Sequence, residues 1–171
     1  MQKNRERILF IAYGAIIAAI YVATTVPNPI SSGPIQIRFS EALCVLPLFT
    51  PAAIPGLFIG CLIANFVEGL PIYDVIFGSL ATLAAAMWAY SFTKMKFTAS
   101  YAKWLTPWPA IIFNAAIIPF VLRYAYGLPY GIPLLVVTVG AGQIISCAVL
   151  GYPLLLLLEK YRKPIFGITK T

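Results

Sequence analysis

Histidine is absent from this chain of 171 residues, and its absence excludes several chemistries at once. Without histidine there is no Ser-His or Cys-His nucleophile pair, no histidine-ligated haem and few of the usual zinc sites. No Gly-Lys dipeptide occurs either, so the sequence contains no P-loop for ATP. These absences argue against a self-contained enzyme.

Charge is also scarce. Only 10% of the residues are charged and 61% are hydrophobic, with a mean hydropathy of +0.90. A soluble domain averages about 25% charged residues, and a water-soluble fold of this length cannot bury so much apolar surface. The composition therefore predicts an all-α, polytopic membrane protein, with a single integral membrane domain over residues 1–171 and the lipid bilayer as its solvent.

The cysteines lack the spacing of a metal site. Cys44, Cys61 and Cys147 form no CxxC pair, and all three lie in apolar runs. Cysteine in such a setting behaves as a small hydrophobic residue. We expect no disulfide framework, no metal and no cofactor.

Basic residues are gathered in a few places. Ten of the twelve lysines and arginines fall in three clusters: Lys3, Arg5 and Arg7; Lys94, Lys96 and Lys103; Lys160, Arg162, Lys163 and Lys170. Under the positive-inside rule these clusters mark cytoplasmic loops and tails. No basic module interleaved with aromatic residues appears, so nucleic acid is not an expected partner.

The apolar runs predict six transmembrane helices, with both termini in the cytoplasm. The first run is longer than a signal-peptide core and no A-x-A site follows it, which indicates an uncleaved helix. Because the N-terminus and residues 94–103 are both basic, the stretch between the first and fourth helices must cross an even number of times. Prolines at 47, 51 and 55 favour a hairpin of two short arms that turns near residues 50–53. The expected helices span approximately 8–26, 40–50, 53–67, 74–93, 105–123 and 133–158.

Small residues spaced four apart provide faces on which helices can pack closely. The first helix carries two such pairs, Gly14 with Ala18 and Ala15 with Ala19, and the second arm of the hairpin carries Gly56 with Gly60. Ordinary alanine-rich filling explains the pairs of the first helix equally well.

Polar residues inside the apolar runs are the candidate site. In the expected topology Glu41, Glu68 and Asp74 lie on the outer side, as do Arg38 and Arg123. A charge at mid-membrane costs at least about 2.5–3.5 kcal/mol, so such groups usually face a cavity or each other. With Asn65, Asn114 and Gln143 they indicate a polar pocket open to the outside.

Each of these residues also has a purely structural explanation. Arg38 and Glu41 are three apart and can pair on one helical turn, whereas Glu68 and Asp74 flank a turn where water can solvate them. Arg123 can extend its charge to the membrane interface. An interhelical hydrogen bond accounts for Asn114 and Gln143. The tyrosines 124, 126 and 130 fit either an interfacial belt or aromatic walls over a flat ligand.

Three stretches of the sequence resemble one family of membrane proteins. They are Ile35-Gln-Ile-Arg-Phe-Ser-Glu-Ala-Leu43, the run from Ile54 to Asn65, and Asp74-Val-Ile-Phe-Gly-Ser-Leu-Ala-Thr-Leu83. The chain resembles the QueT family over essentially its whole length. These are S-components, the substrate-binding subunits of energy-coupling factor (ECF) importers, and they are assigned to queuosine precursors.

The resemblance implies a six-helix bundle that binds its substrate near the extracellular face in the bacterial cell membrane. It implies a transmembrane scaffold subunit and two ATPase subunits as partners, with Ala15 and Ala19 against the scaffold. The implied ligand is a 7-deazaguanine base. We expect its polar core to comprise Glu41, Asp74, Asn114 and Gln143, with Asn65 and Arg38 nearby.

Three other functions remain open at this level. The chain can be an S-component for another vitamin, such as riboflavin or thiamin. It can be a structural membrane subunit without a ligand. An intramembrane protease is disfavoured, because that chemistry needs two carboxylates at mid-membrane depth and the candidates here lie near the outer surface.

Overall fold

The computed structural model describes residues 2–28, 36–94 and 101–166, and within these ranges every regular element is a helix. The basic residues Lys96 and Lys170 lie outside the described ranges. In chain order the elements are α1 (Gln2–Thr25), η1 (Phe39–Leu48), α2 (Ala53–Val67), α3 (Ile72–Ser91), η2 (Phe92–Lys94), α4 (Ala102–Leu105), α5 (Trp108–Tyr124), α6 (Ile132–Gln143), η4 (Ile144–Val149), α7 (Gly151–Lys160) and α8 (Arg162–Phe166).

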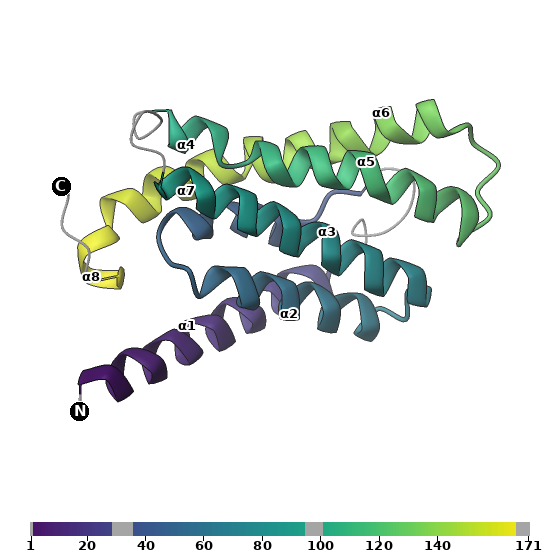
Figure 1. Ribbon diagram of the computed structural model, residues 1–171. Helices are drawn as coiled ribbons and strands as arrows, with labels where there is room; N and C mark the ends of the chain where they lie inside the picture. The colour runs from purple at the N-terminus through teal and green to yellow at the C-terminus, as the bar shows by residue number, and fades with distance from the viewer. Residues whose placement is uncertain (1, 29–35, 95–100, 167–171) are drawn as a thin grey trace.

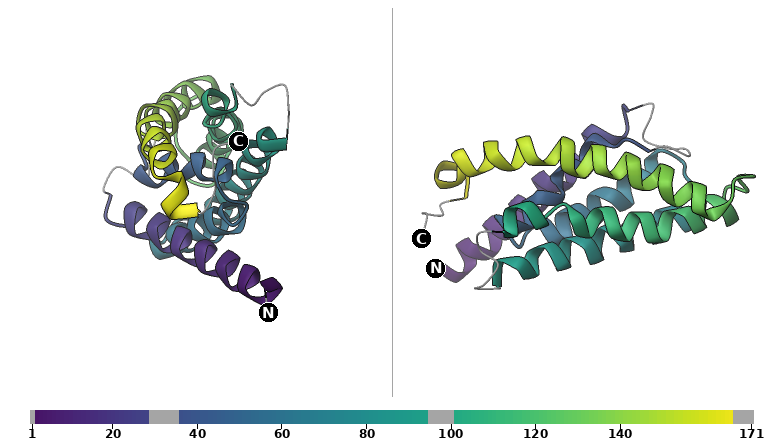
Figure 2. Two further views of the ribbon diagram at one scale, coloured as in Figure 1. Left: turned by 90° about the vertical axis from the view of Figure 1, so that its left-hand side faces the viewer. Right: turned by 90° about the horizontal axis from the view of Figure 1, so that it is seen from above.

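The helices run back and forth along one common direction (Figure 1). The start of α1, the short helix α4 and the end of α7 share one end of the bundle, and the turns between α2 and α3 and between α5 and α6 share the other. We call these the terminal end and the turn end. Neighbouring helices pack in sequence order, α1 on α2, α2 on α3, α3 on α5 and α5 on α6. Seen end-on, α1 lies obliquely across one side (Figure 2).

Four helical stretches of the described residues are long and apolar enough to span a membrane: Lys3–Thr25, Ile72–Lys94, Ala102–Tyr124 and Ile132–Lys160. Two further apolar helices, η1 and α2, are shorter than the other four, as expected for the arms of the hairpin. Large apolar side chains cover the outside of the bundle, including Ile8, Ile11, Phe66 and Val137, each more than half exposed. An apolar exterior of this extent suits lipid and does not suit water.

The first arm of the hairpin is wound as a 3₁₀ helix, where the sequence predicted an α-helix. Backbone amides near its two ends donate to the carbonyl three residues back, Glu41 to Arg38 at 3.2 Å and Phe49 to Leu46 at 2.9 Å. Pro47 lies inside this helix and donates no hydrogen bond of its own. Seven of the ten residues of η1 are buried, and it packs against α1, α3 and α7. The short arm therefore lies within the bundle.

The last apolar run was expected to form one helix over residues 133–158, but it contains a π-helical turn, η4, between α6 and α7. The Leu150 amide bonds to the Ile145 carbonyl at 3.1 Å, which is the five-residue spacing of a π-helix. Pro153 explains the placement, because it has no N–H for the carbonyl of Val149 and its ring would collide with that carbonyl in a regular helix. The π-helical turn η4 accordingly ends at Val149, the residue whose carbonyl Pro153 cannot bond.

The glycines of α2 seat it closely on α1, which confirms Gly56 and Gly60 as a close-packing face. A Cβ atom at Gly56 would lie 2.8 Å from the Gly14 carbonyl oxygen, and one at Gly60 would lie 2.7 Å from the Tyr21 Cβ and 3.1 Å from the Ala18 Cα. Of the two small-residue pairs on α1, Gly14 with Ala18 packs against these glycines of α2. The other pair, Ala15 with Ala19, is exposed.

We predict that Gly60→Ala lowers the stability of the protein by about 1–3 kcal/mol, because its new methyl group overpacks the α1–α2 contact. Gly140→Ala is the matched control, since a Cβ there meets only the Ala115 Cβ at 3.9 Å. Alanine also favours a helix over glycine, so the control should unfold at or above the wild-type temperature. Thermal unfolding in detergent measures both. A Gly60→Ala protein as stable as the control would contradict the close packing.

Candidate functional site

Arg38 joins the two halves of the bundle at the start of η1. Its backbone N–H donates to the Ser146 hydroxyl of η4 at 3.0 Å, and its guanidinium Nη1 donates to the side-chain oxygen Oδ1 of Asn65, on α2, at 3.1 Å. The side chain is 5% exposed. Arg38 also interacts electrostatically with both Glu41 and Asp74. The expectation that Arg38 simply pairs with Glu41 on one turn is therefore too narrow.

Asp74 lies in the first turn of α3, where the helix dipole favours a carboxylate. Its Oδ2 accepts a hydrogen bond of 2.6 Å from the Tyr126 hydroxyl, and its backbone carbonyl accepts one of 3.3 Å from the Asn65 side-chain amide. The residue is 1% exposed, which excludes the solvated loop charge that the sequence allowed. Among the described residues, no hydrogen-bond donor reaches its Oδ1.

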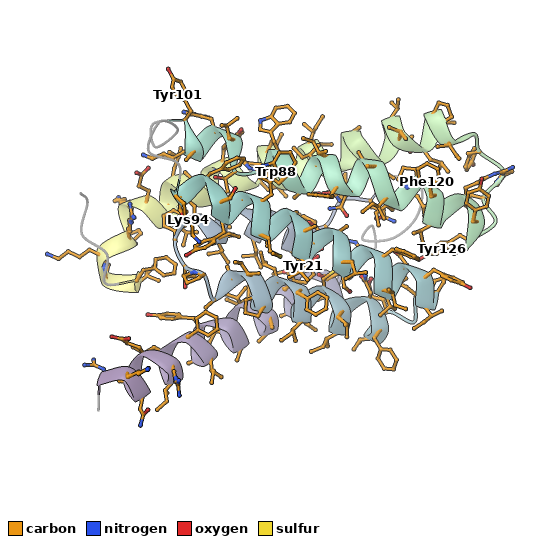
Figure 3. The ribbon with its side chains drawn as sticks, in the orientation of Figure 1. Tyr21, Trp88, Lys94, Tyr101, Phe120 and Tyr126 are labelled. Atoms are coloured by element: carbon orange, nitrogen blue, oxygen red, sulfur yellow. The ribbon has the colours of Figure 1, made fainter. Side chains whose placement is uncertain are left out.

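Tyr126 turns inward from the loop between α5 and α6, at the turn end of the bundle (Figure 3). Partial burial, followed by the hydrogen bond to Asp74, raises the pKa of the Tyr126 phenol. The hydroxyl therefore stays protonated and donates to Asp74. Tyr124, in contrast, is 76% exposed and fits the interfacial belt.

Glu41 and Tyr21 form a second pair, and Tyr21 lies nearer the middle of the bundle than Tyr126 does (Figure 3). The Tyr21 hydroxyl donates to Glu41 Oε1 at 2.7 Å, and both side chains are buried. Beside them lies an internal cavity of about 10 Å³, which Thr82 and Thr106 also line. That volume holds about one water molecule.

Asn114 and Gln143 meet between α5 and the end of α6. The Asn114 side-chain amide donates to the Gln143 side-chain oxygen Oε1 at 3.4 Å and to the Ala110 backbone carbonyl at 3.0 Å. The Cys147 thiol donates to the same Gln143 oxygen at 3.2 Å. The interhelical hydrogen bond is thus present, although it is long and leaves both amides with further hydrogen-bonding capacity.

Gln36 is a buried polar residue that sequence reasoning did not select, although it lies in the stretch with the family resemblance. Its side chain is 2% exposed, and among the described residues its Nε2 has no hydrogen-bond partner. Its backbone crosses α6 at Gly142, where a Cβ atom would lie 2.3 Å from the Gln36 carbonyl oxygen. Only a glycine at 142 allows this approach, so the two residues position the start of η1 together.

The predicted site residues therefore fall into one group of four and one separate pair. Arg38, Asn65 and Asp74 are connected directly, Asn114 and Gln143 form a pair, and Glu41 joins the first group through the field of Arg38. Sequence reasoning missed Gln36, Tyr21 and Ser146, and it assigned Tyr126 either to an interfacial belt or to aromatic walls over a ligand. A polar residue within an apolar run was the available signal for Tyr21 and Ser146.

Other charged residues lie outside this group. Arg123 is exposed and donates to the Leu128 carbonyl at 2.6 Å, as an interfacial arginine does. Glu159 forms an ion pair with Lys103 near the terminal end. Among the residues that the structure describes, no group of three potential ligands is placed to hold a metal ion.

Comparison with known proteins gives one family and one relative. The QueT transporter family model matches residues 11–160. The queuosine precursor transporter QueT of Lactococcus lactis subsp. cremoris is 44% identical over 72 residues, which are 40% of this chain and 42% of the relative. The aligned part thus spans less than half of that protein. No solved structure matches this chain. Because the family model covers most of its length, the chain belongs to the QueT transporter family.

Proposed function

We propose that this chain is the substrate-binding membrane subunit of an ECF-type, ATP-driven importer, and that it binds a queuosine precursor from the extracellular side. Membership of the QueT family and the similarity to a queuosine precursor transporter support the substrate class. The observation that carries the proposal is the buried polar group at Arg38, Asn65 and Asp74, inside helices that are otherwise apolar. Such groups in a membrane protein mark substrate pathways.

The chemistry of a 7-deazaguanine base fits these side chains. Its ring N–H and exocyclic amine form a donor edge that one carboxylate, Glu41 or Asp74, can accept. The amides of Asn114 and Gln143 can form hydrogen bonds with its carbonyl and ring nitrogen. Asn65 and Arg38 would lie near the bound base. Aromatic side chains such as Tyr21 or Tyr126 can contact the flat ring.

The proposed orientation has six membrane passes and both termini in the cytoplasm. Lys3, Lys103 and Lys160 lie near the terminal end of the bundle, so the positive-inside rule places this end in the cytoplasm. The turn end, with Asp74 and Tyr126, then faces outward. The short helices η1 and α2 complete the six passes, and a locally thinned bilayer accommodates their length.

The proposed partners are a transmembrane scaffold subunit and two ATPase subunits, which perform the ATP hydrolysis. The chain itself carries no P-loop sequence, so we assign it no enzymatic step. Ala15 and Ala19 are exposed on α1 and are spaced for close approach by another helix. We place the scaffold against them.

The first test is a thermal-shift assay on detergent-purified protein with 7-aminomethyl-7-deazaguanine, 7-cyano-7-deazaguanine, queuine, guanine, riboflavin and thiamin. A ligand that binds only the folded state raises the unfolding temperature, and we expect a rise with a deazaguanine and none with the vitamins. A rise with a vitamin alone would keep the S-component fold and reject the ligand. No rise with any compound would favour a structural subunit.

The second test removes both candidate carboxylates. Glu41→Ala with Asp74→Ala should lower the affinity for the deazaguanine by about a hundredfold or more, because buried charged hydrogen bonds are lost. Glu41→Gln with Asp74→Asn keeps the shape of both side chains and should weaken binding in a folded protein. Glu6→Ala, at an exposed position on α1, is the control. Unchanged binding in both double variants would reject this site.

The third test concerns the scaffold contact. Ala15→Leu with Ala19→Leu should abolish co-purification with the scaffold subunit and leave ligand binding intact, because bulky side chains prevent close helix approach. Ala141→Leu adds the same side chain at an exposed alanine of α6 and should retain the complex. Retention of the complex by the double variant would place the scaffold elsewhere.

A further inference from the structure

The buried side-chain amides of the bundle differ in how their N–H groups are used. A side-chain amide carries two N–H groups. Asn65 Nδ2 donates to the Asp74 backbone carbonyl at 3.3 Å and to the Cys61 sulfur at 3.6 Å. Asn114 Nδ2 donates to two oxygen atoms, at 3.0 and 3.4 Å. Neither amide therefore has an N–H left for a ligand. Gln36 is 2% exposed, and among the described residues its Nε2 has no hydrogen-bond partner.

The side chain of Gln36 points into the bundle. The backbone of Arg38 is extended, with φ −110° and ψ 119°, and in an extended chain residues two apart point to the same side. Exposure alternates along this segment in the same way, because Gln36 and Arg38 are buried and Ile37 is only partly buried. The Arg38 guanidinium reaches Asn65 on α2 at 3.1 Å. The Gln36 amide therefore lies on this inner side as well.

The backbone around Gln36 is held by contacts from three directions. A Cβ atom at Gly142 of α6 would lie 2.3 Å from the Gln36 carbonyl oxygen, so the two backbones are in close contact. The carbonyl of the next residue, Ile37, accepts a hydrogen bond of 2.6 Å from the Asn28 side-chain amide. The Arg38 amide donates to a hydroxyl group of η4 at 3.0 Å. A donor on such a fixed segment loses little conformational freedom when it binds a ligand.

We propose that Gln36 is a ligand-binding residue, and that its Nε2 donates a hydrogen bond to an acceptor atom on the edge of a flat heteroaromatic ligand. A ring carbonyl oxygen or an unprotonated ring nitrogen is such an acceptor. Asn65 and Asn114 would have to give up a protein partner to make this bond, whereas Gln36 gives up none among the described residues. This inference rests on the proposed function and adds to its site a residue on the segment before η1.

The test replaces Gln36 by methionine, which has a similar length but no N–H, and by leucine. Titration calorimetry on the detergent-purified proteins uses 7-aminomethyl-7-deazaguanine and 7-cyano-7-deazaguanine. Gln36→Met should bind the ligand about threefold to tenfold more weakly than the wild type does, which is the effect of one neutral hydrogen bond. Its unfolding temperature without ligand should equal or exceed that of the wild type, because the variant buries no unpaired N–H. Gln36→Leu should give the same two results.

Gln143→Met is the contrasting control, because the Gln143 side chain does have protein partners. Its Oε1 accepts hydrogen bonds from Asn114 at 3.4 Å and from Cys147 at 3.2 Å. Methionine at this position leaves both donors without that acceptor, so the unfolding temperature without ligand should fall below that of the wild type. The control shows that the assay detects a glutamine that stabilises the unliganded protein.

The outcomes separate this inference from the proposed function. If the wild type binds neither deazaguanine, the proposed function fails and the inference fails with it. If the wild type binds and a Gln36 variant of unchanged stability binds equally well, the function stands and the inference is wrong. If both Gln36 variants unfold at a lower temperature without ligand, or do not fold, the amide stabilises the unliganded protein and the inference is overturned. If one variant alone keeps the wild-type unfolding temperature, its titration decides.

Discussion

A guanidinium inside an apolar bundle must be surrounded by acceptors and negative charge, and Arg38 imposes this requirement on the middle of the protein. Its backbone bonds to Ser146 and its side chain to Asn65, so it connects the C-terminal and N-terminal halves of the chain. The two buried carboxylates lie within its field. The entry of η1 into the bundle thus follows from satisfying one charged side chain.

Two irregular helices make that arrangement possible. The 3₁₀ winding of η1 packs a ten-residue segment into the interior, with Glu41 facing Tyr21. The π-turn of η4 carries Ser146 and Cys147, which bond to Arg38 and Gln143. π-helical turns are rare in proteins, and those that do occur are often found at functional sites. Both irregularities involve a proline in a long apolar run, so the residues that disturb the helices also shape the polar site.

Glycine controls how closely these elements approach. Gly56 and Gly60 seat α2 on α1, and Gly142 leaves room for the Gln36 backbone across α6. Close contacts between helices replace the hydrophobic driving force that lipid does not provide. The pair Ala15 and Ala19 has the same spacing and is exposed on α1, which is why we propose that a partner subunit packs there.

Composition and apolar run length alone determined the all-helical class, the membrane setting and the approximate positions of the long helices, because lipid requires internally bonded backbone over long apolar stretches. Polar residues in those stretches also identified Arg38, Asn65 and Asp74 as candidates. The tertiary structure alone decided that Asp74 pairs with Tyr126, that Glu41 pairs with Tyr21, and that Gln36 lies against Gly142. These contacts join residues 20 to more than 100 positions apart, and side-chain periodicity carries no information on such distances.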